Sequence, residues 1–306
     1  MAKSRYFKAF QAAGGFAKKE RTMKKIIALV LVAVSVMSLA LTGCGGSNSS
    51  SKKVKVIDVA LTDEDYAFGV RKDDPELLAS VNEFVAKIKK DGTLDKIMNN
   101  YFGDGKPEGV TPVAANTDAD QLVVVTNAEF APFEYTDGGV YYGVDMEIAK
   151  LLAESLGKEL VIMNVDFDSV CLTVGEGLAD IAMAGLTVNE TRKQTVTFSE
   201  SYYKASQYII AMESDTTFDN CKTVEDVEKI LGGLDDSTTI GVQSGTTGQY
   251  YVEGDEDWGF AGFPVKCTSY SSGALAVQDM VNGNIKYVVI DQAPAEYIVA
   301  GINKVS

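Results

Sequence analysis

Apolar and polar residues alternate in blocks from residue 122 onward, and the blocks switch between strand-like and helix-like patterns. Short apolar runs predict strands at 122–126, 160–163, 180–184, 239–242 and 287–290, and an extended run at 208–212. Helical spacing predicts helices at 143–156, 169–175, 189–194, 224–231, 273–281 and 294–300, and one that begins at Thr247. This alternation predicts an α/β fold made of two sandwiches with mostly parallel sheets.

The segment before residue 104 departs from that order. It contains a predicted strand at 54–57, an extended piece at 66–70, and two predicted helices at 75–89 and 94–101. Residues 103–120, GDGKPEGVTPVAANTDAD, have the glycine, proline and polar content of a linker. The chain is therefore expected to contain an internal connection between two structured parts.

The first 53 residues have the pattern of an export signal. Met23-Lys24-Lys25 is a short basic start, and the apolar run at 26–41 is shorter than the roughly 20 residues of a membrane-spanning helix. The run ends in LTGC at 41–44, before a flexible tether at 44–53. This resembles the lipobox of bacterial lipoproteins, which implies a signal peptide at 1–43, with 1–22 an upstream extension, and lipidation of Cys44. A fortuitous cysteine beside a membrane anchor is the alternative.

Composition and charge limit the classes of function. The 306 residues are 46% hydrophobic and 23% charged, enough for two lobes with a shared core. The chain has no histidine, which excludes Ser-His-Asp and Cys-His centres and any metal site that needs imidazole. A net charge of −15 predicts a surface that repels nucleic acid. No metal and no cofactor are expected.

Three cysteines follow Cys44 in the sequence. Exported proteins can form disulfides, and Cys221 with Cys267 is the predicted pair, with three reduced thiols as the alternative. Cys171 lies in an apolar helical stretch and is expected to pack in the core.

Five short segments with polar or aromatic residues follow predicted strands. They are TNAEFAPFEY at 126–135, Phe167 in VDFDS, AGLTVNETR at 184–192, QSGTTG at 243–248, and Asp291. In α/β folds, ligands bind where loops leave the carboxyl ends of strands. These five segments are therefore the candidate site.

Together the segments resemble the substrate-binding proteins of polar amino-acid ABC importers, which have the two-lobed type II periplasmic-binding-protein fold. DFDS, AGLT-x4-R, VTFSESYYKA and GVQSGTTG carry the likeness. The resemblance implies a bidentate contact from Arg192 to the carboxylate of a free amino acid and an ammonium site at Asp291. Taken singly, such an arginine is usually a surface residue and such an aspartate a helix cap.

The resemblance also implies the remaining ligand contacts. Thr187, Thr246, Thr247 and the backbone N–H of Gly185 would donate hydrogen bonds, and Phe130 and Phe167 would sandwich the ligand side chain, although phenylalanines are more often core residues. Asn127 and Gln243 occupy pocket-lining positions at which relatives can carry charged residues. Their neutral amides favour a neutral or polar amino acid over arginine or lysine.

The order of segments resembles a circular permutation of that family. Residues 64–103 have the character of the family's ending, yet they precede its usual beginning at Leu122. Joining Ser306 to Lys53 would restore the usual order; a truncated tandem copy and a gene-assembly error are the alternatives. The expected boundaries are 73–205 for lobe one, with 104–120 joining the former ends. Lobe two would combine 54–65 and 213–306, with hinge strands at 66–72 and 206–212.

The sequence thus predicts a lipid-anchored extracytoplasmic binding protein that delivers an amino acid to a permease with its ATPase. Closure over the ligand would be a population shift. No P-loop is present, and a monomer is expected. An enzyme similar to cyclohexadienyl dehydratase is an alternative, with Glu129 or Glu134 as acid or base. A receptor-type sensor domain is the third hypothesis.

Overall fold

The computed structural model describes residues 53–255 and 259–305. Residues 53–114 and 119–305, apart from 256–258, form one compact body. The short segment 115–118 does not belong to that body, and within it the Asp118 N–H donates to the Asn116 side chain. The predicted signal peptide and Cys44 lie outside the described residues. In the part of the chain that is described, no helix combines the length and apolar character needed to cross a membrane.

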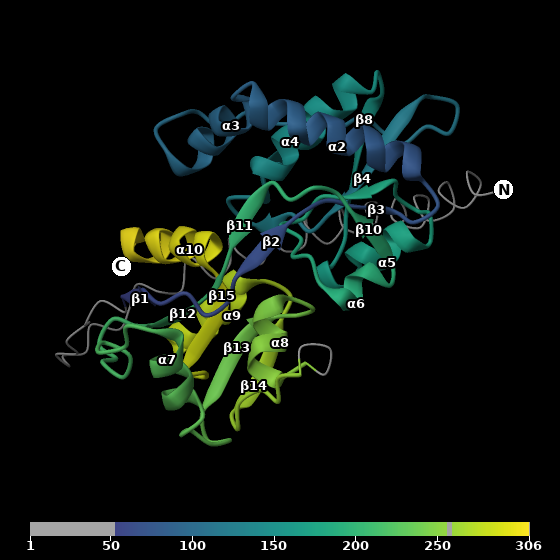
Figure 1. Cartoon of the computed structure of the whole chain (residues 1–306). Coiled ribbons are helices and arrows are strands. Elements are labelled where there is room, and N and C mark those ends of the chain that lie inside the picture. Colours follow the sequence, from purple (N-terminus) through teal and green to yellow (C-terminus); the bar gives the residue numbers. More distant parts are fainter. Residues whose placement is uncertain (1–52, 256–258, 306) are drawn as a thin grey trace, which may run out of the picture. The chain divides into compact units, whose positions relative to one another are not determined.

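The first large sheet has five strands in the order β10-β3-β9-β4-β8 (Figure 1). They are β10 (Val196–Phe198), β3 (Gly69–Arg71), β9 (Ile181–Ala182), β4 (Gln121–Thr126) and β8 (Glu159–Asn164). Strand β4 is parallel to both β8 and β9, whereas β3 runs antiparallel to β9 and β10. The parallel pairs come from the predicted strand–helix–strand units, and β3 is contributed by the separate segment before residue 104.

Helices cover both faces of this sheet. Helices α2 (Pro75–Lys90), α3 (Thr93–Phe102) and α4 (Val144–Ser155) pack together on one face (Figure 1). The other face carries α5 (Val170–Gly175), which follows the 3-10 turn η1 (Phe167–Ser169). Alternate residues of β4 therefore enter different cores: Val124 packs with α4, and Val125 packs with α5.

The second large sheet has the order β1-β12-β15-β13-β14. It contains β1 (Val54–Ile57), β12 (Gln207–Met212), β15 (Tyr287–Asp291), β13 (Thr239–Gln243) and β14 (Lys266–Tyr270). Strand β13 is parallel to β14 and β15, and β12 is antiparallel to β1 and β15. Both large sheets are thus mixed, with a parallel part of three strands extended by antiparallel strands.

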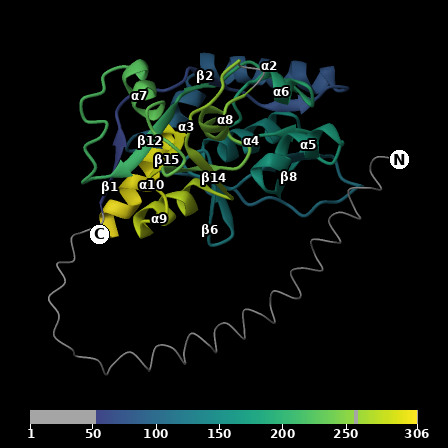
Figure 2. The ribbon, with the colours of Figure 1, turned by 90° about the horizontal axis from the view of Figure 1, so that it is seen from below.

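Four helices flank the second sheet. Helices α9 (Gly273–Asn282) and α10 (Gln292–Val305) lie side by side on one face (Figure 2). Helices α7 (Val224–Leu231) and α8 (Thr247–Glu253) contribute to the core on the other face. The apolar run of β15 is continuous because both of its faces are buried: Val288 packs with α9 and Val289 with α8.

A two-stranded antiparallel sheet lies on the two stretches of chain that connect the large sheets. It pairs β2 (Glu64–Tyr66) with β11 (Tyr203–Ala205). The predicted hinge ranges, 66–72 and 206–212, lie slightly later in the sequence, and their strands β3 and β12 belong to the large sheets instead. The sequence did not indicate this offset because β2, β3 and β11 are only three residues long, too short for a periodic pattern.

The sequence did not indicate the three-stranded meander β5 (Glu129–Phe130), β6 (Glu134–Asp137) and β7 (Val140–Tyr142). These strands are only two to four residues long, too short for a periodic pattern. The turn between β6 and β7 uses Gly138 and Gly139, both with positive φ. The meander packs against α4 through β6 and β7, and it buries Phe130 and Glu134.

The predicted linker is attached to the body over much of its length. The Glu108 N–H donates to Glu147 of α4 (2.7 Å), and Val110 exchanges two backbone hydrogen bonds with Tyr141. Val110 is buried, and Val113 donates to Leu160. Residues 108–113 therefore form specific contacts, although their composition is that of a linker.

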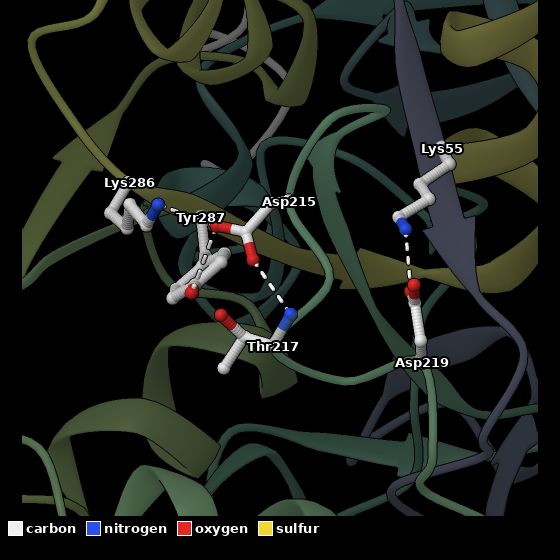
Figure 3. A network of polar contacts seen from close by, with 6 residues as sticks. All are labelled: Lys55, Asp215, Thr217, Asp219, Lys286 and Tyr287. Carbon is white, nitrogen blue, oxygen red and sulfur yellow. Dashed lines mark hydrogen bonds and ion pairs between the residues drawn. The ribbon is translucent and has the colours of Figure 1, made fainter.

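The loop after β12 is held to the second sheet by a polar network (Figure 3). Asp215 receives hydrogen bonds from Lys286 (2.5 Å) and from the Thr217 N–H (2.9 Å), and Lys55 pairs with Asp219 (2.6 Å). Burial opposes ionisation of Asp215, but the bonds from Lys286 and Thr217 outweigh it and hold the pKa of that carboxyl below its usual value.

The predicted disulfide is not present. Cys221 and Cys267 are both free thiols, as is Cys171. Cys221 and Cys267 contribute to the same apolar cluster of the second sheet, where burial raises the pKa of both thiols. The two cysteines share one apolar cluster, so the predicted pairing was reasonable, but no disulfide joins them.

Candidate functional site

The loop after β9 presents Arg192 through a short helix, α6 (Glu190–Lys193). Asn189 caps this helix, and its side chain accepts the N–H of Arg192 (2.8 Å). The guanidinium is buried and donates from Nη1 to the Thr187 carbonyl (2.7 Å) and from Nη2 to the Gly245 carbonyl (3.0 Å). The second of these bonds joins a loop of the first sheet to a loop of the second.

Within the described parts of the chain, no acidic side chain balances the charge of Arg192. Among the described residues, its polar partners are backbone carbonyls, and it lies over the Phe167 ring at 5.2 Å from the ring centroid. Carbonyl dipoles and an aromatic face orient a guanidinium without neutralising it. This end of the site can therefore accept an anion.

Asp291 ends β15 in the second sheet. Its side chain is buried, and Oδ1 accepts the Tyr66 hydroxyl at 2.5 Å. In the β12–β15 register, Asp291 lies opposite Gln207. Within residues 53–255 and 259–305, no lysine or arginine forms an ion pair with this carboxylate.

A second carboxylate, Glu64, lies near Asp291. It accepts hydrogen bonds from three neighbours, namely Thr62 (2.5 Å), Thr187 (2.7 Å) and Gln207 (3.0 Å). Burial and the negative charge of Glu64 raise the pKa of Asp291 to about 7. A cation at this end would remove both penalties, so the geometry favours a positively charged group here.

Two further carboxyl groups are completely buried close by. Asp145, in the first turn of α4, accepts from Tyr202 (2.5 Å) and from the Gly185 N–H (2.9 Å), and burial raises its pKa to about 7. Neither oxygen of Glu134, on β6, has a hydrogen-bond partner among residues 53–255 and 259–305. Burial, followed by the charges of Asp145 and Asp291, raises the pKa of Glu134 well above its usual value.

The loop after β13 contacts the first sheet at several points. Gln243 donates to Asn127 (3.0 Å), and Asn127 donates to the Val165 carbonyl (2.8 Å). Gly245 has a φ of +72°, and a Cβ there would lie 2.9 Å from the Cβ of Asp168. Only glycine combines that backbone conformation with such a close approach.

The two predicted threonines in this loop differ. The Thr246 hydroxyl donates to the Gln243 carbonyl at 2.8 Å, so its proton is already used. The Thr247 hydroxyl is buried and has no partner. Of the two threonines, Thr247 is therefore the one whose hydroxyl is available as a donor. Gln243 Oε1 is likewise available as an acceptor.

The predicted role of Gly185 needs correction. Its N–H donates to Asp145, so it is not a free donor for a ligand. Its φ is +52°, and a Cβ would lie 3.0 Å from the Phe130 ring and 3.3 Å from Tyr66. Gly185 instead allows both rings to pack closely against its own backbone. Sequence alone could not distinguish this packing role from a role in ligand binding.

The two phenylalanines also have protein partners. Phe130 is buried and stacks on Phe133 at 6.2 Å, while Phe167 is partly buried beneath Arg192.

An open groove of about 560 Å³ lies beside Glu64 and Thr187. It is lined by Thr62, Asp63, Glu64, Asp65, Thr187, Val188 and Ser201.

Sequence reasoning missed Glu64, Tyr66 and Asp145. Glu64 and Tyr66 lie before residue 104, far in sequence from the five segments that define the site. Their signal was an acidic and aromatic pair at alternate strand positions, which is common on surfaces. In the described parts of the chain, no three or more potential metal ligands are arranged so that they could hold a metal ion.

Family comparison connects this geometry with a known class of proteins. The model of bacterial extracellular solute-binding proteins, family 3, matches residues 6–104 and 122–286. The chain belongs to this family. Its two-lobed α/β architecture, predicted from the sequence, is confirmed by that match and by the solved structures it resembles.

Individual members of family 3 show moderate similarity. The chain is 31% identical over 126 residues to the arginine-binding extracellular protein ArtP of Bacillus subtilis, covering 41% of this chain and 45% of ArtP. It is 31% identical over 172 residues to an arginine-binding periplasmic protein of Mannheimia haemolytica, covering 56% and 63%. The chain thus spans about half to two thirds of these relatives.

Solved structures give a similar result. A mutant of the arginine-binding protein ArgBP from T. maritima matches with a TM-score of 0.50 at 31% identity, over 60% of this chain and 72% of that chain. An ancestral arginine-binding protein bound to arginine also gives a TM-score of 0.50, at 32% identity, over 60% and 74%.

Proposed function

We propose that this family 3 protein captures a free α-amino acid outside the cytoplasm and delivers it to an ABC importer. The observation that carries the proposal is a pair of buried, opposite charges on different sheets. Arg192 lacks an acidic partner and Asp291 lacks a basic one among the described residues. Relatives named as arginine- and histidine-binding proteins support the same ligand class.

The amino acid would bind as a zwitterion between the two charges. Arg192 would donate two parallel hydrogen bonds to the carboxylate, exchanging backbone carbonyls for an anion. Asp291 would accept from the ammonium. Because these residues belong to different sheets, both contacts form together only when the sheets close on the ligand, so binding shifts the population toward the closed state.

The remaining contacts would complete the pocket. Among the described residues the buried Thr247 hydroxyl has no partner, whereas the predicted donors Thr187 and Thr246 already donate to Glu64 and to the Gln243 carbonyl, so their hydroxyls would only accept. Phe130 and Phe167 would border the ligand side chain. Backbone N–H groups of the loop after β13 would supply further donors to the carboxylate.

Two observations favour different ligand side chains. The bonded amides of Asn127 and Gln243 favour a neutral or polar side chain, because neither brings a charge. Glu134 favours a cationic one as the second candidate, since a buried carboxyl without partners would be stabilised by a positive group. The neutral or polar side chain is the primary proposal.

Isothermal titration with the twenty standard amino acids tests both candidates. Native mass spectrometry of the purified protein should also detect a retained amino acid. Tightest binding to glutamine or another uncharged amino acid supports the primary proposal, and tightest binding to arginine or lysine supports the second. Binding of none of the twenty would contradict the proposed function.

An enzyme is the second functional class. The chain is 31% identical over 109 residues to a cyclohexadienyl dehydratase of Pseudomonas aeruginosa, covering 35% of this chain and 40% of that enzyme. Glu134, with its raised pKa, has the protonation state of a general acid, whereas Glu129 is exposed. Turnover of prephenate or arogenate would favour the enzyme, and reversible binding without turnover favours the binding protein.

The proposed lobes follow the two large sheets once β3 is added to lobe one and β12 to lobe two. Lobe one would comprise 73–205, and lobe two 54–65 with 213–306, joined near β2 and β11.

A circular permutation is supported by β1, which lies in the sheet of β13–β15, and by Asn303, whose side chain exchanges hydrogen bonds with the Val54 backbone (2.9 and 3.0 Å). A rearranged gene that joins 306 to 53 and opens the chain at 104–120 should give a folded protein with unchanged affinity. Loss of folding would contradict the permutation.

Cellular location and partners are part of the same proposal. Lipidation of Cys44 after removal of 1–43 would anchor the protein at the membrane near its permease and ATPase, as a monomer. Replacing Cys44 with serine should move the protein from the membrane fraction to the soluble extracytoplasmic fraction. Unchanged membrane association in that variant would contradict the anchor.

A further inference from the structure

Strand β2 places two buried side chains on the same side of the strand. Glu64 and Tyr66 are separated by two positions, so they share one face of β2, and both are at most 5% exposed. The intervening Asp65 is on the opposite face, where it pairs with Lys204 (3.0 Å). Glu64 and Tyr66 therefore face the protein interior and not the solvent.

Tyr66 contacts the proposed ammonium site directly. Its hydroxyl donates to Asp291 Oδ1 at 2.5 Å, and its ring is held by Phe133 at 5.1 Å and Tyr203 at 5.7 Å. The ring is fully buried, so its hydroxyl has little freedom to move away. The Tyr66 hydroxyl thereby fixes one of the two carboxylate oxygens of Asp291.

Glu64 connects the two ends of the site. It accepts the hydroxyl of Thr187, whose carbonyl accepts Arg192 Nη1. It also accepts the side chain of Gln207, the register partner of Asp291. All three partners of Glu64 are neutral, so its charge is uncompensated beside Asp291.

We propose that Glu64 and Tyr66 are positioning residues of the ammonium site, Tyr66 by orienting Asp291 and Glu64 by adding a second negative charge that selects a cation. This inference rests on the proposed amino-acid binding and assigns strand β2 a role in it. Neither residue needs to contact the carboxylate end of the ligand.

The two residues act on Asp291 in opposite directions. The Tyr66 hydrogen bond stabilises the ionised carboxylate and lowers its pKa, whereas the charge of Glu64 raises it. Glu134 from β6 and Tyr203 from β11 also face Asp291, and Gln207 of β12 is neutral. Binding of an ammonium requires ionised Asp291, so affinity rises as pH increases through the pKa of Asp291.

The test measures affinity across about pH 5 to about pH 9 for wild type, Tyr66→Phe and Glu64→Gln by isothermal titration. The probes are L-glutamine with glutaramic acid, its analogue without the ammonium, and L-arginine with δ-guanidinovaleric acid. Both variants should bind the better amino acid roughly tenfold or more weakly. Both should bind the matching deaminated acid as well as wild type does, or better.

The pH midpoint distinguishes positioning from a general structural effect. Tyr66→Phe should move the midpoint of amino-acid binding to higher pH, and Glu64→Gln should move it to lower pH. Asp65→Asn, on the exposed face of the same strand, is the matched control and should leave it unchanged. Urea unfolding of each variant shows whether it is folded.

Three outcomes decide the inference. Opposite midpoint shifts with amino-acid-specific losses support it. Equal losses of affinity for the amino acid and the deaminated acid, or shifts of the pH midpoint in the same direction in both variants, overturn the inference. The proposed binding of an amino acid would still stand. Wild type that binds none of the twenty standard amino acids overturns the proposed function itself, which is a separate result.

Discussion

The two charged ends of the site are built in contrasting ways. At the Arg192 end, a single cation is held by two backbone carbonyls and one aromatic ring. At the Asp291 end, Glu64, Glu134 and Asp145 add three more buried carboxyl groups, and tyrosine hydroxyls supply the donors to Asp291 and Asp145. The first end is oriented by neutral groups, and the second has an excess of acid.

This difference has an electrostatic consequence. Carbonyl dipoles leave the guanidinium fully charged, so the anion-binding end should be insensitive to pH near neutrality. Clustered buried acids raise one another's pKa, so the cation-binding end should depend on pH. Breaking each end in turn should therefore give different signatures.

The largest effect is expected from Arg192→Met. Loss of two charge-assisted hydrogen bonds, each worth about 1.5–3 kcal/mol, should weaken amino-acid binding by roughly a hundredfold or more. Isothermal titration measures the change, and Lys193→Met on the exposed side of α6 is the matched control. Affinity within about threefold of wild type in Arg192→Met would exclude Arg192 from carboxylate binding.

Asp291→Asn should have the next largest effect. An amide keeps the shape and loses the charge, so affinity at about pH 8 should fall by roughly tenfold to a hundredfold. In wild type, affinity should rise with pH through about 7, because ionised Asp291 is the form that binds ammonium.

The pH dependence is the sharper measurement for this variant. In Asp291→Asn the rise through neutral pH should flatten. A variant that keeps the full wild-type slope would assign that slope to another group, such as Glu134.

Gly245→Ala tests the contact between the loop after β13 and the turn at Asp168. The added methyl group meets Asp168 and strains a φ of +72°, so closure and ligand affinity should weaken by about tenfold. Gly157→Ala is the matched control, because Gly157 has a φ of +68° with open space around it. Equal effects in both variants would show that backbone strain alone is responsible.

The smallest effect concerns stability and isolates the excess of acid. Glu134→Gln removes a buried ionisable group whose pKa is raised. The folded wild type retains this proton at pH values where the unfolded chain has lost it, so wild-type stability falls as pH rises. The variant should gain stability relative to wild type as pH rises from about pH 5 to about pH 9.

Urea unfolding at several pH values measures that gain, with the exposed Glu129→Gln as the control. A difference between Glu134→Gln and wild type that stays constant with pH would mean that Glu134 has the same pKa in the folded and the unfolded protein, which would contradict its raised pKa.

The sequence predicted the regular elements better than the site. Helix α7 and strand β1 have the predicted bounds, because the capping box at Thr223 and the valine- and isoleucine-rich stretch of β1 leave local signals. The β2–β11 pairing joins residues more than 130 positions apart, and the antiparallel pairings of the large sheets also join distant segments, which no local pattern encodes.

The candidate residues show the same limit. Sequence patterns located Arg192 and Asp291 at strand ends but did not reveal which N–H groups the fold already uses. Gly185 illustrates this, since its donor belongs to Asp145. Glu64 and Tyr66 were missed because their importance comes from proximity to Asp291 and not from a motif.

The most direct test uses three arginine-related ligands on three proteins: L-arginine, agmatine, which lacks the carboxylate, and δ-guanidinovaleric acid, which lacks the ammonium. A parallel set uses glutamine, the amide of γ-aminobutyric acid and glutaramic acid, and titration is done on wild type, Arg192→Met and Asp291→Asn. If opposite poles of one zwitterion are held, Arg192→Met binds the carboxylate-free analogue as wild type does, and Asp291→Asn binds the ammonium-free acid as wild type does. Equal losses for every ligand in both variants would contradict the account.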